Sequence, residues 1–274
     1  MAADVTQPAG STPTAESTPS VPRYRPPRKR YEARFLAVYG VLALVLAGAI
    51  TGLVLLVAKP GHHAAATWSS WKPRSSDPEA MVKEIADFVG KEYRLTKGGG
   101  QLVGVVASKP AVQNIEIKAI AVRSAPGSNS NISILGADKT EMFILCGLGS
   151  RCSITKGKPT TARGRVLRRE SLELALYTFK YVPGIDSIVA FLPPKPGSNP
   201  TYTLFLRKSD LSKELKHPLR QTLTRLSAPT PTSTDPKETP VIDRLTLPSL
   251  FQYSLTQSQD GSAILVLDPL ALNG

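Results

Sequence analysis

The residues with the clearest chemistry in this sequence are its only two cysteines, Cys146 and Cys152. They bracket five residues, GLGSR, and lie between the segments FILC and CSIT, which both have strand-like composition. This pattern predicts a hairpin whose cysteines oppose each other and form a disulfide, a bond that persists in an oxidising compartment. A redox pair is the alternative, but redox motifs place two residues between their cysteines at a helix start. We therefore expect a structural disulfide.

A second feature is a run of basic residues that contains no acidic residue. Its seven members are Arg151, Lys156, Lys158, Arg163, Arg165, Arg168 and Arg169. Such a cluster attracts anionic partners, and the attraction weakens as salt rises. The alternative is a solvated helix in which Arg168 and Arg169 pair with Glu170 and Glu173. No aromatic residue that would stack on a base is interleaved with the cluster, so nucleic acid is not the expected partner.

The sequence lacks the common motifs of enzymes. It contains no G-x-S-x-G, no H-E-x-x-H and no Walker-type phosphate loop, and two thiols cannot fill a cysteine-ligated metal centre. The segment from Ser153 to Lys156 matches S-x-x-K, but that chemistry needs a helix, and this stretch has strand-like composition. His217, the only histidine of the folded part, precedes Pro218 at a predicted helix end. We expect no enzymatic activity, no cofactor and no metal site.

An uncharged run of 24 residues, 35–58, precedes these features. As a helix it would extend about 36 Å, against about 30 Å for the hydrocarbon core of a bilayer. The run therefore predicts a transmembrane helix. A cleavable signal peptide is the alternative, although its apolar run would be only about 7–15 residues long. Gly48 and Gly52 have the spacing of small residues that lets two such helices pack as a weak homodimer, or else they face lipid.

The residues that flank this run predict its orientation. Six basic residues precede it, namely Arg23, Arg25, Arg28, Lys29, Arg30 and Arg34. Because basic residues resist translocation, the N-terminus is expected in the cytoplasm and the C-terminal part outside it. The last four of the six are also expected to contact anionic membrane lipid. After the run, Trp68 and Trp71 suit the membrane interface, or alternatively pack under the exported domain.

The first hundred residues carry a resemblance. The basic, proline-containing tail and the apolar run are followed by TWSSWKP at 67–73 and by a helix that ends in KEYRL at 91–95. This arrangement resembles uncharacterised single-pass cell-envelope proteins of actinobacteria. The resemblance implies a cell-envelope setting and no particular activity.

Apolar periodicity predicts an α+β fold, in which one transmembrane helix precedes a domain with a largely antiparallel sheet and two or three helices. Asp77 is expected to cap a first helix, a second helix is expected over 161–181, and Asp260-Gly261 is expected to turn a C-terminal hairpin. The predicted segments are a disordered basic cytoplasmic tail (1–34), a transmembrane helix (35–58), a juxtamembrane segment (59–76), an extracytoplasmic α+β domain (77–227), a Pro/Thr-rich linker or loop (228–240) and a C-terminal β-hairpin segment (241–274).

These features predict a non-enzymatic, single-pass protein of the cell membrane. Its exported basic domain is expected to bind an envelope protein or an anionic envelope polymer, because the chain has 34 Lys and Arg against 21 Asp and Glu. Two alternatives stay open. One is a membrane-anchored hydrolase or transferase that acts on cell-wall or lipid material, and the other is a scaffold subunit of a secretion or conjugation assembly.

Overall fold

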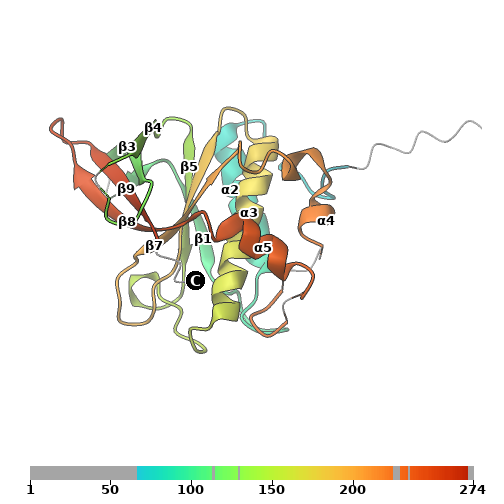
Figure 1. Cartoon of the computed structure of the whole chain (residues 1–274). Helices are drawn as coiled ribbons and strands as arrows, with labels where there is room; N and C mark the ends of the chain where they lie inside the picture. Colours follow the sequence, from blue (N-terminus) through green and yellow to red (C-terminus); the bar gives the residue numbers. More distant parts are fainter. Residues whose placement is uncertain (1–66, 113–114, 129, 225–228, 234, 271–274) are drawn as a thin grey trace, which may run out of the picture. The chain divides into compact units, whose positions relative to one another are not determined.

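The computed structural model describes residues 67–270, apart from 113–114, 129, 225–228 and 234 (Figure 1). The predicted tail and transmembrane run, with Gly48 and Gly52, lie outside these described residues. So do four of the residues expected at the membrane, Arg28, Lys29, Arg30 and Arg34. Within the described part, no helix combines the length and the apolar character needed to cross a membrane.

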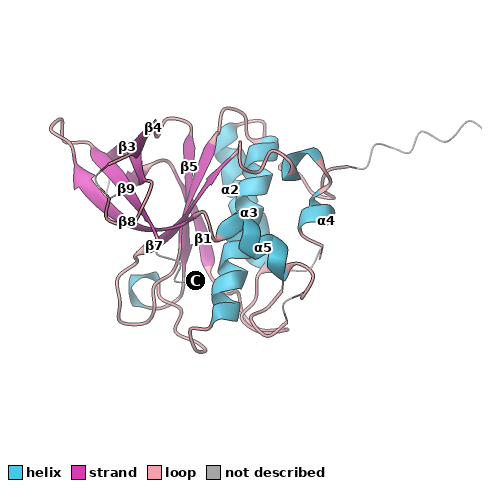
Figure 2. Ribbon diagram, viewed as in Figure 1, coloured by secondary structure: helices cyan, strands magenta, loops and turns pink. Residues whose placement is uncertain are grey.

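A single mixed sheet of nine strands forms the centre of the domain. Its order is β1-β5-β6-β7-β8-β9-β3-β2, and β4 also pairs with β3. The strands are β1 (Gly104–Ser108), β2 (Ala111–Val112), β3 (Ile115–Arg123), β4 (Ile132–Gly136), β5 (Thr140–Cys146), β6 (Ser187–Phe191), β7 (Tyr202–Arg207), β8 (Leu250–Gln257) and β9 (Ala263–Pro269). Figure 2 shows that the sheet is strongly twisted.

Two strand pairs of this sheet are parallel. β5 pairs in parallel with β6, and β3 pairs in parallel with β9. Parallel neighbours need a long crossover connection, and a helix between β5 and β6 supplies one. The expected α+β domain with a largely antiparallel sheet is therefore wrong. The observed architecture is a mixed sheet that curls toward a barrel and carries few helices.

The helices are α2 (Pro78–Glu92), α3 (Thr161–Tyr181), α4 (Leu219–Thr222) and α5 (Thr239–Thr246), with short 3-10 turns η1 (Ser150–Cys152) and η2 (Glu214–Lys216). Asp77 caps α2 as predicted, since its side chain accepts a hydrogen bond of 2.8 Å from the Ala80 amide. The second predicted helix is confirmed as α3. The helix expected to end at His217 is reduced to η2. Figure 2 shows α2, α3 and α5 together on one side of the sheet.

Apolar residues are buried on both faces of the sheet. On the face toward α2 and α3, Phe143 and Leu145 pack with Leu172 of α3 in one core. On the opposite face, Met142 of β5 and Leu265 of β9 belong to a second core. Consecutive residues of β5 therefore face different cores, as the two-residue period of a strand requires. A sheet buried on two faces explains why the five residues of β6, SIVAF, are all buried.

The C-terminal hairpin joins this sheet near its middle. The predicted turn at Asp260-Gly261 connects β8 to β9, which pair along their length. β8 also pairs with β7, and β9 pairs with β3, so the hairpin links the two halves of the sheet. The segment expected as a linker is tied to the domain too, because Thr230 and Glu238 are buried and α5 begins at Thr239.

Candidate functional site

The two cysteines form the predicted disulfide. Cys146 ends β5 and Cys152 lies in η1, so the bond closes a short loop. The loop is not a β-hairpin, however, since the next regular element after η1 is the helix α3 and not a strand. Instead, the amides of Gly147 and Gly149 each donate a hydrogen bond of 2.8 Å, to the carbonyls of Cys152 and Ser153. Short-range bonds inside the loop therefore replace a strand ladder.

The backbone of this loop is tightly constrained. Arg151 and Cys152 have φ angles of 54° and 62°, a left-handed conformation that non-glycine residues adopt at a cost. A Cβ atom added to Gly147 would lie 2.2 Å from the Ser153 carbonyl oxygen, so only glycine fits there. The constrained backbone holds Leu148 at the tip, where it is 92% exposed. We call residues 147–151 the clamped loop.

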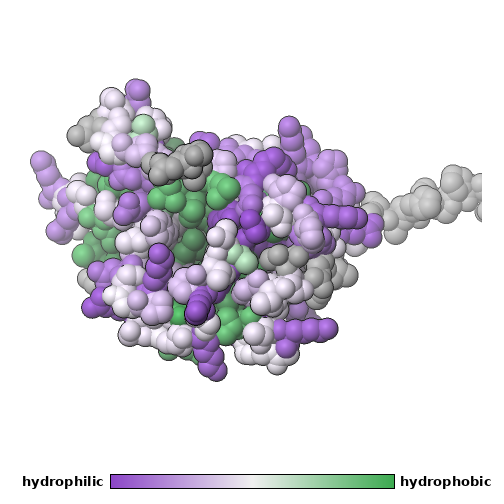
Figure 3. Space-filling model, turned by 60° about the horizontal axis from the view of Figure 1, so that its bottom comes forward, coloured by the Kyte–Doolittle hydropathy of each residue, from purple (hydrophilic) through white to green (hydrophobic). Residues whose placement is uncertain are grey.

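An apolar groove lies beside the clamped loop. Its volume is about 250 Å³, and its lining residues include Cys152, Phe191, Pro194, Pro200, Tyr253 and Leu255. Phe191 and Tyr253 meet edge to face with ring centroids 4.8 Å apart. Arg151 reaches the loop that carries Pro200, because its guanidinium donates a 2.7 Å hydrogen bond to Asn199. On this lower side of the domain, Figure 3 shows hydrophobic side chains in a hollow among hydrophilic ones.

The seven residues of the predicted basic cluster divide into two groups. Arg151, Lys156 and Lys158 are exposed, and among the described residues none of the three has an ion-pair partner. They lie in or just after the clamped loop. The other four lie on α3 and turn toward the protein. Of these, Arg163 is 6% exposed and donates a hydrogen bond to the Lys156 carbonyl.

Two arginines of α3 hold α5 in place. Arg165 and Arg168 both bind the carboxylate of Asp243, at 3.0 Å and 2.7 Å. Arg168 also donates a hydrogen bond of 2.6 Å to the hydroxyl of Thr246. Burial opposes the charge on Asp243, but the hydrogen bonds from the two arginines outweigh it and lower the pKa of this carboxyl. These arginines connect α3 to α5 and are occupied within the domain.

Arg169 is the centre of a buried ionic network. Its guanidinium binds both carboxylate oxygens of Glu238, at 3.0 Å and 3.1 Å, and both side chains are 1% exposed. It also donates to Tyr93 and to Glu173. Burial opposes its charge, but these partners outweigh burial and raise the pKa of the guanidinium. The predicted pairing within the helix therefore forms for Arg169 and Glu173, while Arg168 binds Asp243 instead.

Glu170 is buried without a partner. The residue is fully buried, and within the described part of the chain its carboxyl oxygens accept no hydrogen bond. Burial raises the pKa of this carboxyl well above its ordinary value, and the nearby Glu173 raises it further. Burial therefore disfavours the charged form of Glu170, and among the described residues Arg168 pairs with Asp243 rather than with Glu170.

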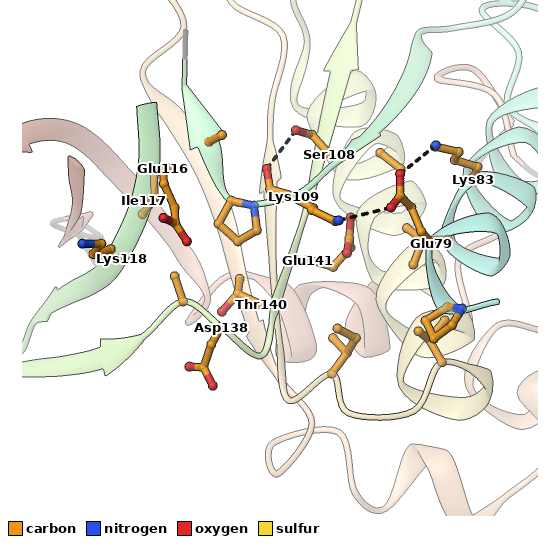
Figure 4. Close-up of a pocket in the computed structure, with 18 of the residues that line it drawn as sticks. Glu79, Lys83, Ser108, Lys109, Glu116, Ile117, Lys118, Asp138, Thr140 and Glu141 are labelled. Atoms are coloured by element: carbon orange, nitrogen blue, oxygen red, sulfur yellow. Dashed lines mark hydrogen bonds and ion pairs between the residues drawn. The ribbon is translucent and has the colours of Figure 1, made fainter. Parts of the chain in front are cut away.

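A second hollow lies at the opposite end of β5. This cleft has a volume of about 890 Å³ and lies between the start of α2, the β1–β2 turn, β3 and β5. Its floor includes Val82, Ile117 and Ile185. Its rim carries more carboxylates than amines (Figure 4); the acids are Asp77, Glu79, Glu116, Asp138 and Glu141, and the lysines are Lys83, Lys109 and Lys118.

The lysines of this cleft are already paired. Glu79 binds Lys83 at 3.0 Å and Lys109 at 3.2 Å, and Lys118 binds Asp260 at 2.9 Å. Glu141 lies close to Lys109 and Glu79 in Figure 4. Burial, with the charge of Glu79 as a second cause, raises the pKa of the Glu141 carboxyl to about 7. The cleft thus keeps an acidic excess over an apolar floor.

Trp68 and Trp71 pack against the domain. Trp71 stacks on Phe88 of α2 with ring centroids 4.0 Å apart, and Trp68 meets the edges of Tyr177 and Tyr181 at 5.5 Å and 5.6 Å. Of the two alternatives raised by the sequence, these contacts correspond to packing under the domain. They lie at the C-terminal end of α3, whereas Lys158 and the clamped loop lie near its N-terminal end.

The residues tested for enzyme motifs do not form a site. Ser153 is 2% exposed and lies outside any helix, and His217 is exposed beside η2. Among residues 67–270 that the structure describes, no group of three metal-ligating side chains comes together. Comparison of the chain with protein-family models, with curated proteins and with solved structures finds no match.

Sequence reasoning missed several residues of these surfaces. No pattern in the sequence distinguishes Leu148, because a single leucine in a turn has no characteristic spacing. Asp243 and Glu238 lie near or within the segment expected to be a linker, so their pairing with α3 was not foreseen. The available signal was the stretch from Asp235 to Asp243, which contains three acidic residues in nine positions.

Proposed function

We propose that this chain is a non-enzymatic protein of the cell membrane whose extracytoplasmic domain binds a partner protein. The contact surface consists of the clamped loop, the apolar groove beside it, and Arg151, Lys156 and Lys158. The partner presents an acidic surface that also carries an apolar side chain.

The exposure of Leu148 is the observation that carries this proposal. A large apolar side chain that is 92% exposed gains almost no burial energy from its own fold. Here it stands on a loop closed by a disulfide and by two backbone hydrogen bonds. A rigid loop loses little conformational entropy on binding, which makes its contacts more favourable. The disulfide also supports an extracytoplasmic location, where such bonds persist.

The composition of the surface favours a protein over an anionic polymer. A polymer of phosphates or carboxylates is bound by charge alone, whereas this surface combines Leu148 and an aromatic groove with three cations that form no ion pair among the described residues. Moreover, four of the seven residues of the basic cluster are arginines of α3 whose side chains bind groups within the domain. The remaining charge is suited to steering and orienting a partner rather than to holding a long polyanion.

The hydrolase or transferase alternative has less support. Glu141 has a pKa near neutrality in a large cleft, as a general acid or base would. However, the hydroxyl groups that line this cleft are engaged: Ser108 donates to the Lys109 carbonyl and Thr140 bonds Ser187. Neither hydroxyl is therefore free to act as a nucleophile, and one carboxyl of raised pKa does not by itself define a reaction.

Quantitative co-purification from native membranes tests the proposal. The full-length chain is compared with the triple variant R151E/K156E/K158E and with a matched control, K213E/K216E/R220E, which reverses three exposed charges elsewhere. We expect the first variant to lose its principal partner protein and the control to retain it. Equal recovery of every protein with both variants would refute the proposal.

A further inference from the structure

The cleft and the clamped loop have complementary chemistry. The loop presents an apolar side chain, Leu148, with positive charge from Arg151 and from the segment that follows. The cleft has an apolar floor under a rim on which Glu116 and Asp138 are exposed and, among the described residues, have no ion-pair partner. The loop protrudes and is basic and apolar, whereas the cleft is hollow, acidic and apolar. The two surfaces therefore complement each other in shape and in charge.

We propose that the partner of the clamped loop is a second copy of this chain, which receives the loop in its acidic cleft. Leu148 of one copy contacts the floor of the cleft formed by Val82 and Ile117, and Arg151, Lys156 and Lys158 meet the carboxylates of the rim. This inference rests on the proposed function and names its partner.

The positions of the two surfaces determine the kind of assembly. β5 begins beside the cleft, at Thr140 and Glu141, and ends at Cys146 of the clamped loop. A strand of seven residues spans about 20 Å, so one copy can use both surfaces at once. Because the surfaces differ, a contact made once per copy is head to tail and builds rings or open chains, whereas a reciprocal exchange of loops between two copies gives a two-fold dimer.

Three observations support entry of the loop into the cleft. The loop is narrow, since Gly147 and Gly149 flank Leu148 and carry no side chains. The cleft, at about 890 Å³, is large enough for several side chains. Glu79 already binds two lysines on this rim, which shows that the cleft accommodates ammonium groups. Cations of a second copy would meet the acids that these lysines leave unpaired.

A charge-swap experiment tests this inference on the full-length chain. The loop variant is R151E/K156E/K158E, the cleft variant is E116K/D138K, and K213E/K216E/R220E is the control. Sedimentation velocity at low salt should show self-association of the wild-type chain and of the control. Each of the first two variants alone should bind itself at least about tenfold more weakly, because like charges now face each other.

Mixing distinguishes complementary contact from mere loss of fold. The cleft variant has positive charges on its rim and the loop variant has negative charges on its loop, so their mixture should associate again. A monomeric wild type, equal association of all variants, or a mixture that stays monomeric would overturn the inference. Self-association through Gly48 and Gly52 would not change with the charge reversal on the loop or with the one on the cleft. If the loop variant still loses a different protein in membrane co-purification, the proposed function stands and only self-recognition fails.

Discussion

The buried ion pair between Arg169 and Glu238 makes a strong prediction about stability. Glu238→Ala removes the two hydrogen bonds of 3.0 Å and 3.1 Å to the Arg169 guanidinium, a group that is 1% exposed and that also donates to Glu173 and Tyr93. Removing one partner of a buried pair costs about 3–5 kcal/mol. Because a domain is stable by only about 5–15 kcal/mol in total, this loss is a large fraction of it.

Urea unfolding of the oxidised protein, followed by circular dichroism, measures this loss. The matched control is Asp210→Ala, which removes an acid from the exposed pair with Arg207, whose side chains are 53% and 42% exposed. That change should cost less than about 1 kcal/mol. If Glu238→Ala destabilises the protein no more than the control does, then α5 and the segment before it do not depend on Arg169, and the account of the network is wrong.

Other changes test separate parts of the structure. Replacing Cys146 and Cys152 by serine should lower the free energy of unfolding by about 2 kcal/mol, measured in urea, since a small closed loop gains little from its cross-link; unchanged stability would contradict a structural role. Burial raises the pKa of Glu141 to about 7, above its ordinary 4.5, so the folded state loses stability as pH rises from 4.5 to 7. In the wild type this loss of stability should be about 1–3 kcal/mol between urea titrations at pH 5 and pH 8. Glu141→Gln should abolish the loss, and a loss that persists in the variant would come from other acidic residues. Glu170→Met should stabilise the protein at pH 7 by about 1–2 kcal/mol, because it removes a buried carboxyl that has no hydrogen-bond partner in the described part of the chain; a lower melting temperature would show that the carboxyl is satisfied. Trp71→Ala should cost about 2–3 kcal/mol through loss of its stacking on Phe88, whereas loss of vesicle binding at unchanged stability would place the ring at a membrane.

The features that sequence predicted well are set by local interactions. Asp77 caps α2 because its side chain reaches an amide three residues later, and Asp260-Gly261 turns a hairpin through the conformations of those two residues. The disulfide joins cysteines only six positions apart. Each of these features is contained in a few consecutive residues, so composition and spacing are sufficient to find it.

The features that sequence missed depend on residues far apart in the chain. The parallel pairing of β3 with β9 joins segments separated by more than a hundred residues, and no local pattern encodes it. The arginines of α3 looked like a solvent-exposed cluster because their acidic partners, Glu238 and Asp243, lie some 70 residues later. Whether a charge is paired is a property of the tertiary structure, which a one-dimensional count does not contain.

The central claim is that the clamped loop is a site of contact with another protein. Incorporation of a photo-crosslinking amino acid at position 148, in cells that make the full-length chain, tests it most directly. Position 134 is the control, because Ile134 is also apolar and 74% exposed but lies on β4, away from the loop. We predict a defined crosslinked protein from position 148 and none from position 134. No adduct at position 148, or the same adducts at both positions, would contradict the claim.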